Sequence, residues 1–190
     1  MAENDEINIY LIRHGEAGKS WDEDPDPGLS NKGEKQSIKL VSKLSDDFKK
    51  LNFKAISSPL LRAQETAIPL KEEFGFDIKI DKNFAEIPSP GIELYQRSAW
   101  LKEIFKVRVA ELEQPQQEWR NTIIQSIQNI REDTIIFSHF MVINCAVGWL
   151  SNFDKLVSFY PDNCSVTKIV NRKGKLQLVQ TGNELSTIVQ

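Results

Sequence analysis

The sequence predicts an α/β fold: a three-layer sandwich of a mostly parallel sheet with helices on both faces and a helical lid insertion. Short, nearly continuous apolar runs are typical of strands that are buried on both faces. Segments with apolar residues at helical spacing separate these runs, and strands that alternate with helices form parallel sheets. The strands expected in the parallel part of the sheet are 7–12, 53–57, 78–80 and 134–138.

Local signals define the remaining elements. Apolar residues at helical spacing, Ile38 and Leu40 among them, predict a helix over 31–51 with these side chains on its inward face. A second helix is predicted over 60–74, in which Pro69 marks a kink or a boundary. A third helix is expected over 141–150. Further strands are expected around 157–160, 165–170 and 176–180, the last two joined as a hairpin through Gly174.

The stretch 92–132 carries no strand signal. It reads as two helices broken near Gln114-Pro115, since proline suits the first turn of a new helix. We therefore expect a single domain over 1–190, with a helical insertion at about 92–132 that is well placed to form a lid.

Composition limits the classes of function. The net charge is -3 and the chain has no strongly basic block, so we expect no nucleic-acid partner. The apolar runs are too short to span a bilayer, and the acidic start 1–6 is unlike a secretory signal. Cys145 and Cys164 lack metal-ligand spacing, which favours buried, reduced thiols. We expect a cytoplasmic protein with neither metal nor cofactor; nothing in the sequence indicates its oligomeric state.

The chain has only two histidines, and both follow predicted strands. His14 closes the run that begins at Ile7, and His139 closes the run 134–138. The carboxyl ends of strands are where open α/β sheets place their ligand crevices. Histidine can accept and return a group near neutral pH, so the two positions predict a paired site.

Four segments resemble the histidine phosphatase superfamily, the phosphoglycerate mutase-like proteins. Residues 11–16 (Leu-Ile-Arg-His-Gly-Glu) are similar to its signature. The stretches 28–36, 57–67 and 135–139 resemble its first helix start, its second arginine motif and its second histidine strand, in the same order. The resemblance covers most of the chain, and 92–132 is the part least matched.

The resemblance implies a phosphate site whose chemistry suits these residue types. His14 would be the nucleophile, and Arg13 and Arg62 would hold the phosphoryl oxygens with forked, permanently charged donors. His139 would supply another donor, and Gly15 would allow close backbone approach beside the nucleophile. Two nearby guanidinium groups favour the neutral imidazole that attack requires.

One carboxyl group can protonate the leaving alkoxide and then activate water. Glu86 stands where the family places this residue, and Glu93 is a second candidate because the residues after Glu86 depart from the family pattern. Asn163 lies in a segment that resembles a loop bordering the family's active site. Phe140 stands where the family usually has glycine, and it would narrow the pocket or shield it from water.

We therefore expect a metal-independent phosphohydrolase that acts on a small phosphorylated metabolite through a phosphohistidine. Three alternatives remain: a mutase, a phosphatase of protein phosphohistidine, and a binding module without activity. Ala17 stands where mutases tend to have a hydroxyl residue, although the pair Glu16-Ala17 echoes the short relatives that act on phosphohistidine. A lid over 92–132 would close the site to a protein substrate.

Overall fold

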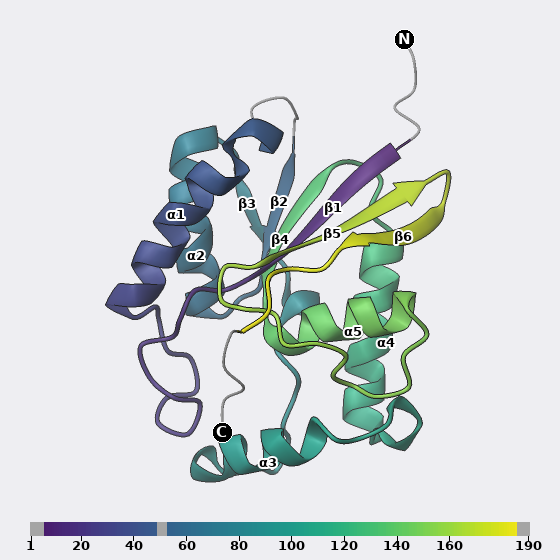
Figure 1. Cartoon of the computed structure of the whole chain (residues 1–190). Coiled ribbons are helices and arrows are strands. Elements are labelled where there is room, and N and C mark those ends of the chain that lie inside the picture. Colours follow the sequence, from purple (N-terminus) through teal and green to yellow (C-terminus); the bar gives the residue numbers. More distant parts are fainter. Residues whose placement is uncertain (1–5, 49–52, 186–190) are drawn as a thin grey trace.

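A six-stranded sheet organises the chain in the computed structural model, which describes residues 6–48 and 53–185 (Figure 1). The strand order is β3-β2-β4-β1-β5-β6. The first four strands run parallel, and β5 and β6 add an antiparallel edge next to β1. The strands are β1 Glu6–Arg13, β2 Lys54–Ser57, β3 Ile78–Ile80, β4 Thr134–Ser138, β5 Val166–Arg172 and β6 Lys175–Gln180.

Helices cover both faces of the sheet, which confirms the predicted three-layer α/β architecture. α1 (Asn31–Phe48) and α2 (Leu61–Phe74) pack on one face, and α4 (Gln114–Gln128) and α5 (Phe140–Leu150) pack on the other (Figure 1). Successive residues of β1 supply the two cores. Ile9 and Leu11 pack with α4 and α5, whereas Tyr10 and Ile12 pack with α1 and α2.

The stretch 92–132 divides into two structurally different parts. α3 (Arg97–Ile104) lies beyond the carboxyl edge of the sheet, flanked by 3₁₀ turns at Leu94–Gln96 and Val109–Glu111. By contrast, α4 buries Ile123 and Ile127 completely in the core beneath α5. Its apolar stripe therefore covers the sheet. Only residues 94–111, which we call the α3 segment, are positioned as a lid.

Hydrogen bonds and ring contacts hold the α3 segment in place at both ends. The Ser98 N–H donates to the Asp22 carboxylate at 2.7 Å, and the rings of Trp21 and Trp100 lie 6.3 Å apart. At the other end, the Val109 N–H donates to the Asp154 carbonyl at 2.8 Å. These contacts set the position of α3 relative to the carboxyl edge of the sheet.

Three expectations need correction. The predicted strand 157–160 is a loop, because the N–H groups of Ser158 and Phe159 donate to the side chain of Asn144 and not to a neighbouring strand. α2 continues through Pro69 without ending. Ile38 is 61% exposed, although its spacing suggested an inward position. The predicted end of the first helix at Leu51 lies outside the described residues.

The predicted hairpin and the two buried thiols are confirmed. Lys173 and Gly174, both with positive φ, make the tight turn between β5 and β6, as expected of a two-residue hairpin loop. Both cysteines are free and buried, and burial raises the pKa of Cys145 and of Cys164 to about 12. Within residues 6–48 and 53–185, no helix combines the length and the apolar character needed to cross a membrane.

Two glycines bring the loop after β1 against the start of α1. A Cβ built on Gly15 would lie 2.7 Å from the Gly33 carbonyl oxygen, and one built on Gly33 would lie 2.1 Å from the Glu16 carbonyl oxygen. Real Cβ atoms do not approach backbone so closely, so the contact requires the absence of a side chain on both segments. This close approach positions the residues that follow β1.

We predict that Gly33→Ala lowers the free energy of unfolding by about 1–3 kcal/mol, the usual cost of overpacking a tight contact. Gly148→Ala in α5 is the matched control, since its new Cβ would meet nothing closer than 3.8 Å. That variant should leave stability unchanged or raise it slightly. Urea unfolding curves of the two variants provide the measurement, and equal midpoints would contradict the packing argument.

Candidate active site

The sheet register brings the two histidines side by side. β1 and β4 are adjacent and parallel, and Arg13 pairs with Ser138, so His14 and His139 follow at the same level of the sheet. The His14 N–H donates to the Ser138 carbonyl at 3.0 Å, and the two imidazole rings lie 5.2 Å apart. The strand ends thus create the paired site that the sequence suggested.

The next strand, β2, brings Arg62 to the same place. The Ser58 N–H donates to the Phe137 carbonyl of β4, and α2 begins three residues later. Arg62 lies in the first turn of α2 and is 5% exposed. Its Nε–H donates to Nε2 of His14 at 3.2 Å. The second arginine motif therefore meets the first histidine motif through the parallel order of β2, β4 and β1.

His14 is held as a neutral imidazole. Its Nδ1 lies 2.7 Å from the Gly15 carbonyl oxygen, so Nδ1 carries the proton and Nε2 presents its lone pair towards Arg62. Burial lowers the pKa of His14 well below its ordinary value, and the charges of Arg62 and Arg13 lower it further. The neutral ring can therefore act as a nucleophile through the Nε2 lone pair.

Three buried nitrogens beside His14 have no hydrogen-bonding partner among the described residues. They are Nε of Arg13, Nη1 of Arg62 and Nδ1 of His139. Such orphaned groups are rare in folded proteins and call for an explanation. Here they are polar nitrogens of the kind that can donate to an oxyanion. Arg13 and Arg62 line one pocket together with His14, whereas His139 is not among the lining residues and its ring lies beside that of His14.

A serine sets the orientation of His139. Nε2 of His139 lies 2.7 Å from Oγ of Ser58, and this oxygen also accepts the Leu60 N–H at 3.2 Å. The Ser58 hydroxyl can then donate to Nε2, which leaves Nδ1 of the neutral ring as the protonated donor. Burial lowers the pKa of His139 well below its ordinary value, so the ring remains neutral.

Glu86, and not Glu93, reaches the pocket. Glu86 lines the cavity with Arg13, His14 and Arg62, whereas Glu93 is exposed and is not among the lining residues. Burial raises the pKa of Glu86, although the Ile87 N–H bonded to its carboxylate and the Arg62 charge oppose the shift. A carboxyl group that keeps its proton at higher pH than usual can act as a general acid.

Asn163 and Gly15, two of the predicted site residues, do not line the pocket, and their hydrogen bonds instead fix the backbone around His14. The side-chain amide of Asn163 donates to the His14 carbonyl at 3.0 Å. The Gly15 N–H donates to the hydroxyl of Thr66 at 2.9 Å, and that hydroxyl donates to the Arg62 carbonyl at 2.6 Å. Thr66 thus links the nucleophile's loop to α2. Sequence reasoning missed this role, although Thr66 falls within the second arginine motif.

Phe140 contacts both Arg13 and the α3 segment. Its ring stacks on Phe105 of that segment at 5.1 Å, and the guanidinium carbon of Arg13 lies 5.3 Å from its centroid. The other end of the Arg13 guanidinium donates to the Pro161 carbonyl at 2.7 Å. Phe140 therefore lines the pocket and also packs against the Arg13 guanidinium.

The pocket has a volume of about 550 Å³, which suits a small molecule. The two arginines, His14 and Glu86 form one end. Leu101 and Phe105 of the α3 segment contribute to the remaining wall. The sequence did not identify the lysines that line the pocket, because exposed lysines give no pattern; they are Lys19, Lys102 and Lys106.

The aspartates of the acidic loop 22–26 accept hydrogen bonds from backbone N–H groups. Asp22 accepts from the α3 segment, and Asp24 accepts the Asp26 N–H at 3.0 Å. Asp26 accepts the Leu61 N–H at 2.8 Å and lies 3.9 Å from Nη1 of Arg62. In the part of the chain that the structure describes, no three histidine, cysteine or acidic residues converge in a way that could hold a metal ion.

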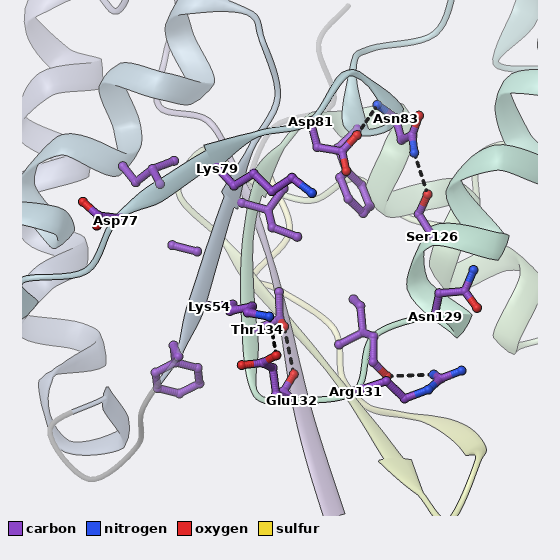
Figure 2. Close-up of a pocket in the computed structure, with 16 residues that line it drawn as sticks. Lys54, Asp77, Lys79, Asp81, Asn83, Ser126, Asn129, Arg131, Glu132 and Thr134 are labelled. Atoms are coloured by element: carbon purple, nitrogen blue, oxygen red, sulfur yellow. Dashed lines mark hydrogen bonds and ion pairs between the residues drawn. The ribbon is translucent and has the colours of Figure 1, made fainter.

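A second hollow of about 860 Å³ lies between the end of α4 and strands β2 and β3 (Figure 2). Several of its polar groups pair with one another: Lys54 pairs with Glu132, and Asn83 donates to Ser126 at 3.1 Å. Asp81 accepts the backbone N–H of Asn83. Neither histidine is among the described residues that line this hollow, whereas His14 lines the smaller pocket.

The fold and this site define an α/β protein built for phosphoryl chemistry. The chain matches the family model of the histidine phosphatase superfamily, branch 1, over residues 9–184. It belongs to this superfamily, as its four motifs indicated. No curated protein matches the chain by sequence comparison.

Solved structures share the fold at low sequence identity. The phosphoserine phosphatase of Entamoeba histolytica has a TM-score of 0.72 and 20% identity, over 93% of this chain and 97% of that one. A phosphoglycerate mutase from Bacillus anthracis gives 0.69 and 19%, over 93% and 92%. A mycobacterial glucosyl-3-phosphoglycerate phosphatase gives 0.70 and 17%, over 94% and 100%. At these identities the likeness shows the fold alone.

We predict that neither imidazole titrates near its ordinary pKa of about 6.5. Burial and the arginine charges lower both values, so the protons should bind only at distinctly lower pH. The measurement is a proton NMR titration of the two histidine Cε1–H signals, with the urea-unfolded chain as the control. Titration of both signals near 6.5 in the folded protein would contradict the model of the site.

Proposed function

We propose that the protein is a phosphomonoesterase that hydrolyses a small phosphorylated metabolite through a phosphohistidine at His14. The observation that carries the proposal is the set of unpartnered nitrogens of Arg13, Arg62 and His139 beside the lone pair of a neutral, buried histidine. A phosphoryl group presents three charged oxygens and an electrophilic phosphorus, which match these donors and this nucleophile.

In the first step, Nε2 of His14 attacks phosphorus and the ester P–O bond breaks. Arg62 releases its bond to Nε2 as the phosphoryl group arrives, and its guanidinium, with that of Arg13, binds the transferring oxygens. Nδ1–H stays on the Gly15 carbonyl and stabilises the positive charge that develops on the ring. The protonated Glu86 carboxyl gives its proton to the leaving alkoxide.

In the second step, water replaces the histidine. The Glu86 carboxylate takes a proton from water while the water oxygen attacks phosphorus, and the P–N bond breaks. Phosphate leaves and His14 returns to the neutral state. The residues that position these groups are Thr66 for the loop after β1, Asn163 for the His14 carbonyl and Ser58 for His139.

Hydrolysis is proposed in preference to mutase transfer because of the side chains that line the pocket. Ala17 offers no hydroxyl to a second substrate position. The lining is mostly apolar, with few groups able to bind the hydroxyl groups of a sugar while it is repositioned to accept the phosphoryl group. Incubation with 3-phosphoglycerate, scored for isomer against free phosphate, separates the two reactions.

We predict that His14→Ala abolishes phosphatase activity on p-nitrophenyl phosphate. The wild type, quenched in alkali during turnover, should carry one phosphoryl group on the peptide that contains His14, and this group should be lost in acid. Mass spectrometry of the quenched digest is the measurement, and urea unfolding checks that the variant folds. Undiminished turnover by His14→Ala would refute the proposed nucleophile.

We predict a leaving-group dependence for Glu86→Gln. Alkyl phosphates need a proton on the leaving oxygen, so their hydrolysis should fall by about 10²–10⁴-fold. p-Nitrophenolate leaves without a proton, so this ester should still phosphorylate His14 and give a burst of p-nitrophenol. Stopped-flow absorbance measures the burst. Equal loss with both kinds of ester, or wild-type rates in Glu86→Gln with Glu93→Gln inactive, would contradict the assignment.

A further inference from the structure

We propose that the substrate is a phosphomonoester with an apolar, hydroxyl-poor body, such as an aryl or arylalkyl group, that carries a second anionic group. The inference deepens the proposed function and rests on it. It concerns the part of the pocket that lies beyond the catalytic end and would receive the alcohol half of the ester.

The wall of this outer part is apolar. Leu101 and Phe105 from the α3 segment face Phe140 and Met141 from the start of α5 within one pocket. Phe105 and Phe140 stack on each other, and Tyr160 lies 5.7 Å from Phe140 and 6.4 Å from Phe105. A flat hydrocarbon group would gain free energy by covering this surface.

The same wall lacks partners for a polyol. Apart from the catalytic groups and the lysines, its polar side chains are Ser98, Tyr160 and the indole of Trp21. No asparagine, glutamine, threonine or aspartate is among the described residues that line the pocket. A sugar or glycerol body would bring several hydroxyl groups, and each one left without a partner weakens binding.

The positive charge of the lysines that line the pocket indicates that the substrate carries a second anionic group. Lys19, Lys102 and Lys106 line the pocket together with Arg13 and Arg62, and Glu86 is the one acidic residue among the described lining residues. Asp24 lies 3.5 Å from Lys19, and Glu103 lies 2.8 Å from Lys106. Lys102 makes no ion pair with a described residue. A net charge of -3 over the chain makes this local excess of cations notable.

The test uses four phosphate esters of primary alcohols, so that leaving-group reactivity is similar. They are benzyl phosphate, 4-(phosphooxymethyl)benzoate, the corresponding benzamide, and glucose 6-phosphate. We expect kcat/KM for benzyl phosphate to exceed that for glucose 6-phosphate by at least about tenfold. The benzoate should exceed the neutral benzamide. Replacing the carboxylate by a second phosphate shows which anion is preferred.

Lys102→Met removes the charge and keeps the length of the side chain. We expect a loss in kcat/KM for the benzoate that is about two- to fivefold larger than the loss for benzyl phosphate, the size of an exposed ion pair. The double variant with Lys106→Met should lose about five- to tenfold. Lys39→Met, on the exposed face of α1, is the matched control and should change neither ester.

The outcomes separate the two proposals. Hydrolysis of all the esters at similar rates, or preference for glucose 6-phosphate, would overturn the substrate class and leave the phosphatase proposal standing. A benzoate no better than the benzamide would overturn the second anionic group. If no ester yields phosphate and no phosphohistidine forms, the proposed function itself fails.

Discussion

A single hydrogen bond organises the site: the Nε–H of Arg62 donates to Nε2 of His14, while Nδ1 of the same ring meets the Gly15 carbonyl. These two contacts together set the tautomer, the neutral charge and the orientation of the His14 ring. It requires a buried guanidinium beside a buried imidazole, a combination that disfavours the protonated ring. The neighbouring contacts of Thr66, Asn163 and Gly33 serve to hold these two side chains in register.

The position of the site in the fold depends on the pairing of the strands more than on the packing of side chains. β2, β4 and β1 are adjacent, parallel and in register, so residues that are far apart along the chain reach one edge of the sheet. Sequence periodicity was sufficient to place those strands, and the strand ends placed His14 and His139. Arg62, which lies in α2, was indicated by the resemblance of 57–67 to the second arginine motif. Apolar runs are a strong signal because strands buried on both faces admit few polar residues.

The sequence was less informative where a contact depends on the third dimension. An amphipathic stripe shows that α4 buries one face, but not that the face covers the sheet instead of the pocket. The apolar run at 157–160 resembled a strand, yet Asn144 supplies its hydrogen bonds. The hydroxyls of Ser58 and Thr66 took on their roles only once neighbouring strands brought His139 and Gly15 within reach. Choosing Glu86 over Glu93 likewise required the pocket.

The two buried cysteines have a practical consequence. With each thiol pKa at about 12, neither Cys145 nor Cys164 offers an appreciable thiolate to a maleimide at neutral pH. A cysteine introduced at exposed Ala99 on α3 would therefore be labelled selectively without removing either native thiol. A fluorophore at that position would report how the α3 segment moves against the pocket during turnover.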